Sequence, residues 1–113
     1  MNDVVETVLE LNIAKDFTVT PGPRFIAEGP FSGEQFREDL LKKHFEQARR
    51  ESAVLRVDLD GGYGYAPSFL EEAFGGLARQ YGMQVVLDTL SFKSDEEPLL
   101  IADIDGYIRK AGN

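Results

Sequence analysis

The sequence predicts an α/β domain with a mixed sheet of about four to five strands and helices packed on it. Short extended segments alternate with amphipathic segments of helical spacing, the order expected of strands joined by helical crossovers. The length of 113 residues and the hydrophobic fraction of 42% allow one buried core and no second. We therefore treat residues 1–113 as a single domain.

Two extended segments open the chain. Apolar and polar residues alternate over residues 4–14, which is typical of a strand with one buried face. Residues 17–27 contain Pro21-Gly22-Pro23, which favours a turn between two short extended pieces. We expect these first strands to close one edge of the sheet as a hairpin or an irregular edge.

A first helix is predicted from Ser32 to about Arg50. The Ser32 hydroxyl can accept a hydrogen bond from the Gln35 N–H, and the Gln35 side chain can reach back, as in a capping box. Phe31 can pack on Phe36 as a hydrophobic staple. The apolar residues of this helix then fall on one face: Phe36, Leu40, Leu41, Phe45 and Ala48.

A second helix is predicted from about Ser68 to Tyr81. Ser68 with Glu71 has the spacing of another capping box. Gly75-Gly76 inside this helix costs ~2 kcal/mol of helix propensity relative to two alanines. We therefore expect a close approach of backbone or partner at these glycines.

The remaining elements are two strands and a third helix. Strands are predicted at residues 54–59 and 85–92, and a helix at residues 96–110, where Pro98 is tolerated in the first turn. Right-handed helical crossovers between the strands follow from this order.

The composition argues against several classes of partner. The formal charge of −8 repels phosphate backbones and anionic lipid, so we expect neither nucleic acid nor a membrane surface. No apolar run approaches the ~20 residues of a spanning helix, and the N-terminus lacks the basic start of a secretory signal. The absence of cysteine excludes disulfides and thiolate chemistry. We expect a cytoplasmic protein.

The loop between the 54–59 strand and the second helix is the predicted recognition site. Such a loop exposes backbone N–H groups at the positive end of a helix dipole. Tyr63 and Tyr65, flanked by glycines, offer amphipathic area that suits an interface, together with Asp60 and Ser68. The alternative for the tyrosines is that one ring packs over the sheet edge.

A second hypothesis is an anion pocket. Arg24 follows the rigid proline turn and can approach the two helix starts, where Ser32 and Ser68 lie. The alternative is that Arg24 pairs with one of the 20 acidic residues.

A third hypothesis is a Mg²⁺-dependent phosphatase, because Asp58 and Asp60 at the end of a strand can hold a metal and attack a phosphoryl group. The alternative is that they shape the turn. No Ser-His-Asp set or phosphate loop accompanies them, so we predict no enzyme activity and no metal site.

Three segments carry a family resemblance: Pro21-Gly22-Pro23-Arg24, residues 29–37, and Asp58 through Leu77. On these the chain resembles bacterial STAS-like domains of unknown function, distant relatives of the anti-sigma-factor-antagonist domains. The resemblance implies a regulatory module without a cofactor, in which a serine after a central strand is phosphorylated by a histidine-kinase-like ATPase. Ser68 is the serine at that place. The antagonists have Asp-Ser followed by Gly, whereas this chain has Ala66-Pro67-Ser68-Phe69.

The leading hypothesis is thus a non-enzymatic interaction module that binds a partner such as this ATPase through the loop at 60–68 and the helix that follows. The anionic-ligand sensor comes second and the phosphatase third.

Overall fold

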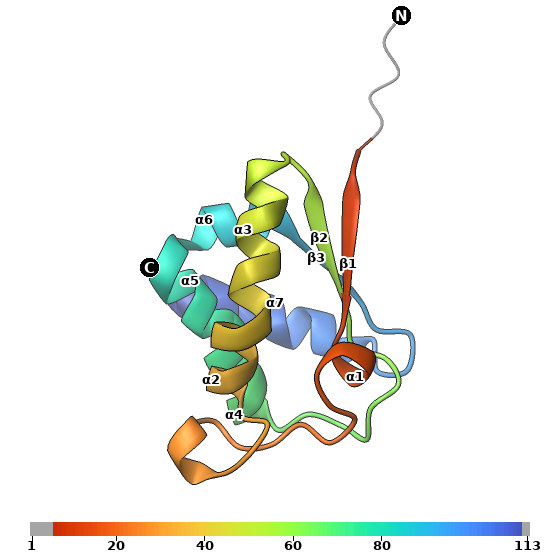
Figure 1. Ribbon diagram of the computed structural model, residues 1–113, viewed down its shortest axis with the longest axis vertical. Helices are drawn as coiled ribbons and strands as arrows, with labels where there is room; N and C mark the ends of the chain where they lie inside the picture. The colour runs from red at the N-terminus through yellow and green to blue at the C-terminus, as the bar shows by residue number, and fades with distance from the viewer. Residues whose placement is uncertain (1–5, 112–113) are drawn as a thin grey trace, which may run out of the picture.

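The computed structural model describes residues 6–111, which form a sheet with helices on one face (Figure 1). The sheet has three parallel strands in the order β1-β2-β3, namely β1 (Val8–Asn12), β2 (Val54–Asp58) and β3 (Leu90–Lys93). The expectation of a mixed sheet of four to five strands was therefore wrong, whereas the α/β class is confirmed.

The predicted hairpin is absent from the described part of the chain. Residues 4 and 5 lie outside that part, and the strand at residues 4–14 is reduced to β1, because its last residues form a helical turn, α1 (Ile13–Asp16). Beyond it runs a loop with one 3₁₀ turn, η1 (Ile26–Glu28). The backbone around the prolines pairs with the start of the first helix, since Gly22 N–H donates to Phe31 O and Gly33 N–H donates to Pro23 O.

The first predicted helix is confirmed and runs without a break as α2 (Gly33–Phe36), the π-helical segment η2 (Arg37–Leu41) and α3 (Lys42–Arg50). Ser32 Oγ accepts from Gln35 N at 2.9 Å, and Gln35 Oε1 accepts from Phe31 N at 3.0 Å. The ring of Phe17 lies 5.5 Å from that of Phe31 and 5.4 Å from that of Phe36. Phe17 therefore links the two phenylalanines that were expected to touch directly.

The second helix also has a π-helical middle: α4 (Pro67–Leu70), η3 (Glu71–Gly75) and α5 (Gly76–Tyr81). Its N-cap is Ala66, which makes no side-chain capping bond, so the predicted Ser68 cap was wrong. The reason is Pro67, whose fixed φ and missing N–H suit the first helical position. The helix consequently begins one residue earlier, and Ser68 lies inside its first turn.

The segment predicted as a strand at residues 85–92 is divided between two elements. Its first part belongs to α6 (Met83–Thr89) and its last part to β3. The final helix is α7 (Leu99–Ala111). None of the helices in residues 6–111 is long and apolar enough to cross a membrane.

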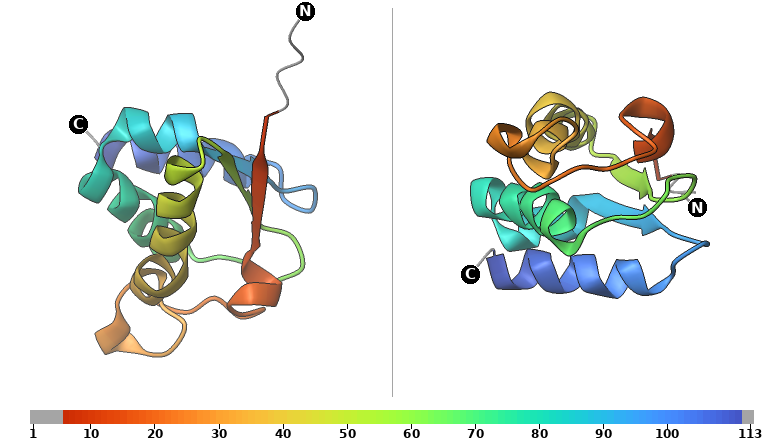
Figure 2. Two further views of the ribbon diagram at one scale, coloured as in Figure 1. Left: turned by 45° about the horizontal axis from the view of Figure 1, so that its top comes forward. Right: turned by 90° about the horizontal axis from the view of Figure 1, so that it is seen from below.

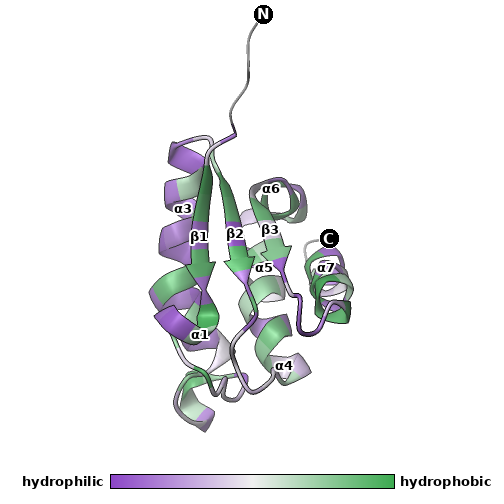
Figure 3. Ribbon diagram, turned by 90° about the vertical axis from the view of Figure 1, so that its right-hand side faces the viewer, coloured by the Kyte–Doolittle hydropathy of each residue, from purple (hydrophilic) through white to green (hydrophobic). Residues whose placement is uncertain are grey.

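All the long helices lie on one side of the sheet, and Figure 3 looks onto the opposite side (Figures 2 and 3). Strand residues alternate accordingly. Leu11, Leu55 and Val57 are fully buried beneath the helices, whereas Glu10 and Arg56 are neighbours on the open face, where Arg56 Nε donates to Glu10 Oε1 at 2.6 Å. A parallel sheet is usually covered on both faces, and here a polar face replaces the second layer.

The two long helices approach each other closely at glycines. A Cβ on Gly33 would lie 2.4 Å from Phe69 O, and a Cβ on Gly76 would lie 2.3 Å from Arg37 Nη1. We expected backbone or a partner to approach Gly75-Gly76 closely, and the group that does so at Gly76 is instead the buried side chain of Arg37.

Candidate functional site

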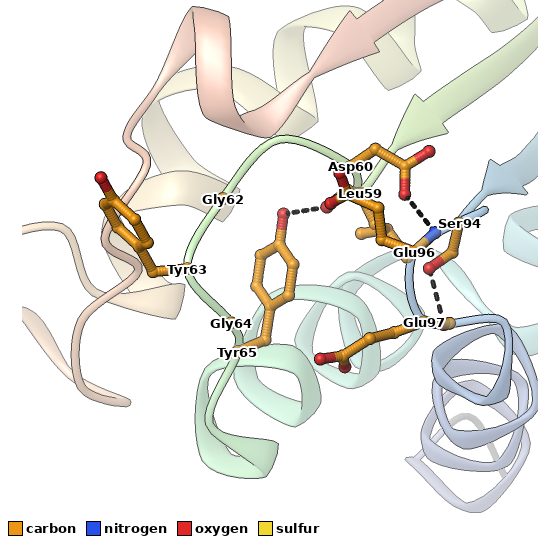
Figure 4. Close-up of a pocket in the computed structure, with 9 residues that line it drawn as sticks. All are labelled: Leu59, Asp60, Gly62, Tyr63, Gly64, Tyr65, Ser94, Glu96 and Glu97. Carbon is orange, nitrogen blue, oxygen red and sulfur yellow. Dashed lines mark hydrogen bonds between the residues drawn. The ribbon is translucent and has the colours of Figure 1, made fainter.

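The carboxyl ends of the three strands lead into loops that meet at one end of the sheet, and Asp60 ties two of them together. Its Oδ2 accepts from Lys93 Nζ at 2.8 Å and from Asp95 N at 3.1 Å. Its Oδ1 accepts from Glu96 N at 3.0 Å, the bond drawn in Figure 4. The Lys93 ammonium, followed by the Glu96 N–H, lowers the pKa of Asp60 to about 2. Asp60 therefore shapes the site, and both of its oxygens are already occupied.

Asp58 and Glu96 complete this arrangement. Asp58 Oδ1 accepts from the Asp60 N–H at 2.9 Å, and Glu96 Oε1 accepts from the Gly61 N–H at 2.9 Å. Asp58 and Asp60 thus shape the turn through these bonds, which was the alternative to holding a magnesium ion. Within residues 6–111, no three His, Cys, Asp or Glu side chains are grouped so as to hold a metal ion.

The two tyrosines of the loop differ sharply. Tyr65 OH donates to Leu59 O at 3.0 Å, its ring packs 5.9 Å from that of Phe69, and burial raises its pKa. Tyr63 is 86% exposed, although its backbone N–H is fixed to Val19 O at 2.8 Å. Tyr65 is thus part of the packing, and Tyr63 is presented outward (Figure 4).

Two hollows adjoin this loop. A small one of about 60 Å³ lies between Tyr65 and the segment after β3, where Ser94 Oγ donates to Glu97 O at 2.7 Å (Figure 4). A larger one of about 380 Å³ lies at the ends of β1 and β2. Its lining combines a lysine, an amide, carboxylates and small residues: Asn12, Ala14, Lys15, Val19, Asp58, Asp60, Gly61 and Glu96.

None of the three residues of the expected anion pocket is fully exposed and without a partner in the structure. Arg24 Nη1 donates to Glu71 Oε1 at 2.6 Å and to Glu72 Oε1 at 3.4 Å, so carboxylates of the second helix occupy its guanidinium. Ser32 is fully buried at the start of the first helix, and Ser68 is partly buried. The pairing of Arg24 with acidic residues is therefore what the structure shows.

A buried ion network joins the π-helical segments, and sequence reasoning missed it. Arg37, 7% exposed, donates from Nη1 to the Glu72 carbonyl and to Glu72 Oε2, both at 2.6 Å. Arg79 binds Glu71 Oε2 at 2.7 Å, and this bond, with that of Arg24, lowers the pKa of Glu71. The one sequence signal for it was the glycine pair, because glycine leaves room for the Arg37 side chain.

Comparison with known proteins gives one result. The family model of the STAS-like domain of unknown function (DUF4325) matches residues 32–100, more than half of the chain. No curated protein and no solved structure matches. The matched region runs from Ser32 through β2, the Tyr63 loop and β3 to the start of α7. The chain belongs to the STAS-like domain family of unknown function.

Proposed function

We propose that this domain is a non-enzymatic regulatory module of the bacterial cytoplasm that binds a partner protein through residues 60–68 and the helix that follows. The resemblance to the anti-sigma-factor antagonists supports a regulatory role. The partner class that its resemblance to the anti-sigma antagonists suggests is a histidine-kinase-like ATPase. No anionic-ligand or phosphatase role has comparable support, since Arg24 and Asp60 already hold partners within the domain.

The observation that carries this proposal is the presentation of Tyr63. Its ring is 86% exposed, whereas the loop is anchored on one side by the Asp60 carboxylate and on the other by the bond to Val19 O. An aromatic side chain on an anchored backbone loses little conformational freedom on binding, which is the property of an interface anchor.

Exposed apolar side chains gather around the same end of the molecule. Figure 1 shows the 17–31 loop and the loop after β2 running side by side below the sheet. Of the eight large hydrophobic side chains exposed in the described residues, five belong to these two loops: Val19, Phe25, Ile26, Phe31 and Tyr63. Phe31 also has a positive φ of 58°, a costly conformation for a residue other than glycine. Five exposed hydrophobic side chains on two adjoining loops support a protein interface.

The test compares Tyr63→Ala with Leu99→Ala. Leu99 is 81% exposed on α7, so the control removes a similarly exposed apolar side chain at another place. With a purified histidine-kinase-like ATPase, we expect Tyr63→Ala to raise the Kd at least tenfold, about 1.4 kcal/mol of binding free energy, while Leu99→Ala leaves it unchanged. Thermal melts must match the wild type. Equal affinities for the two variants would exclude this loop as the interface.

Ser68 tests the regulatory part of the proposal. Because it makes no cap, Ser68→Ala and Ser68→Asp can both be compared without a large change in stability. If a charge at this position switches the interaction, Ser68→Asp weakens ATPase binding and Ser68→Ala does not. Identical affinities would remove Ser68 from the proposal and leave Tyr63 in it.

A further inference from the structure

We propose that the cavity at the ends of β1 and β2 binds a small zwitterionic ligand, an amino acid with a cationic side chain. It is an open depression of about 380 Å³, a volume near the lower end of the roughly 300–1,000 Å³ that is typical of small-molecule pockets. This site adjoins the partner interface at Val19, Asp60 and Gly61 but does not include Tyr63, and the proposal does not depend on that function.

Opposite charges line the cavity from different sides. Lys15 belongs to α1, directly after β1, and Glu96 belongs to the segment after β3. Asp58 ends the middle strand between them. Since neighbouring strands are about 4.8 Å apart, the segments after β1 and β3 are separated by about 10 Å. A cationic group and carboxylates therefore bound the cavity at a spacing that a small zwitterion can bridge.

The polar groups that remain available define the ligand. Asp60 already accepts three hydrogen bonds, from Lys93 and two backbone N–H groups, through both of its oxygens. Asp58 and Glu96 each accept one backbone bond through a single oxygen, so each keeps a second oxygen for a ligand cation. Lys15 forms no ion pair with any residue in the described part of the chain.

The amide of Asn12 adds a directed donor. Its Oδ1 accepts from the Lys15 N–H at 2.8 Å, which fixes the amide and leaves Nδ2 to donate. Lys15 and Asn12 together suit a carboxylate, and Asp58 and Glu96 suit two cationic groups. One carboxylate with two cations is the charge pattern of arginine. Agmatine has the same cations without the carboxylate, and acetate has only the carboxylate.

The experiment titrates L-arginine, agmatine and acetate into the ¹⁵N-labelled full chain and follows amide shifts by NMR. We expect saturable binding of L-arginine with shifts concentrated at residues 12–15 and 58–61. Agmatine is expected to bind at least tenfold more weakly because it lacks the group that Lys15 and Asn12 recognise, and acetate is expected to leave the spectrum unchanged. An equal affinity for agmatine, or no saturation by arginine below about 10 mM, would overturn the proposal.

Two variants make the test specific. Asp58→Asn keeps the Oδ1 that accepts from Asp60 N–H, so the turn is retained while the charge is lost. It is expected to weaken arginine and agmatine binding at least tenfold, and Lys15→Ala is expected to reduce the preference for arginine over agmatine, with Asn12 left to donate to the carboxylate. The control is Lys110→Ala, which removes an exposed cation in the last turn of α7 and is expected to leave arginine affinity unchanged. Wild-type arginine affinity in Asp58→Asn refutes the site and leaves the Tyr63 test unaffected.

Discussion

Gly76→Ala is expected to destabilise this domain, although the same change in an exposed helix interior stabilises a protein by about 1 kcal/mol. An added Cβ would lie 2.3 Å from Arg37 Nη1, 3.0 Å from its Cζ and 3.2 Å from its Cδ. The whole outer half of the Arg37 side chain lies against this glycine, so turning the terminal group alone does not relieve the overlap. The methyl group therefore displaces Arg37 from its ion pair with Glu72.

The expected magnitude follows from the burial of that pair. Separating a buried ion pair costs about 3–5 kcal/mol, because burial keeps water from solvating the separated charges, although Glu72 retains the longer bond from Arg24 at 3.4 Å. After the helix-propensity gain of about 1 kcal/mol is subtracted, the net loss is about 2–4 kcal/mol of unfolding free energy. Such a loss is a large part of the roughly 5–15 kcal/mol that holds a typical domain together.

Urea unfolding measures this effect, and Gly106→Ala is the matched control. Gly106 lies inside α7 with nothing within 4 Å of an added Cβ, so alanine there is expected to add about 0.5–1 kcal/mol. In an Arg37→Leu background, Gly76→Ala should cost less than in the wild type. If Gly76→Ala and Gly106→Ala have the same unfolding free energy, the position of the Arg37 guanidinium does not require a glycine at residue 76.

Three further outcomes are expected. Ser32→Ala should lower the unfolding free energy by about 1–2 kcal/mol and Ser68→Ala by less than about 0.5 kcal/mol, since only Ser32 caps a helix; equal losses in urea melts would contradict the cap assignment. The low pKa of Asp60, about 2, means that its stabilising contribution is present above about pH 4 and is lost as the pH falls toward 2. Asp60→Asn should therefore reduce the change in unfolding free energy between about pH 4 and pH 2. If the variant shows the same pH dependence as the wild type, Asp60 does not contribute this stability. Phe74→Asp places a carboxylate at a fully buried position and should leave a chain that limited proteolysis degrades, whereas wild-type resistance would show that the helix packs differently.

The two long helices and α7 were predictable because their signals are local. The Ser32 box and the apolar face of Phe36 and Phe45 lie within one stretch of sequence, and the structure has both. Strand pairing depends on residues far apart in sequence, and there the reasoning failed. Pro21-Gly22-Pro23 lies in an irregular loop, and its backbone pairs with the start of the first helix and not with a second strand.

Residues 85–89 are a second place where contacts distant in sequence decide the structure. Two valines followed by leucine have high strand propensity, yet they lie in α6, where Val86 is fully buried and Thr89 Oγ1 donates to Val85 O at 2.8 Å. Tertiary packing thus overrides local preference over these residues.

The site was predicted as a segment and not as a set of contacts. The loop with Tyr63 and Tyr65 could be located from its glycines and its place after a strand, but which ring is outside depends on the bond from Tyr65 OH to Leu59 O. Arg37 and Glu72 are 35 residues apart, and no periodicity connects them. Glu38, whose bonds to Gln80 and Arg37 lower its pKa to about 2, belongs to the same nonlocal network.

The position of Asp60 decides which variants can separate the two proposed sites. Its carboxylate joins the Tyr63 loop to the segment after β3, and its backbone N–H is bound by Asp58 at the edge of the larger cavity. Removing Asp60 consequently disturbs both sites at once and cannot distinguish them. Tyr63, exposed beyond the loop, and Asp58, whose charge can be removed with its turn bond kept, each change one site alone. If Tyr63→Ala nevertheless alters arginine binding, or Asp58→Asn alters ATPase binding, the two sites are coupled through the Asp60 bonds, and ligand occupancy then regulates the interface.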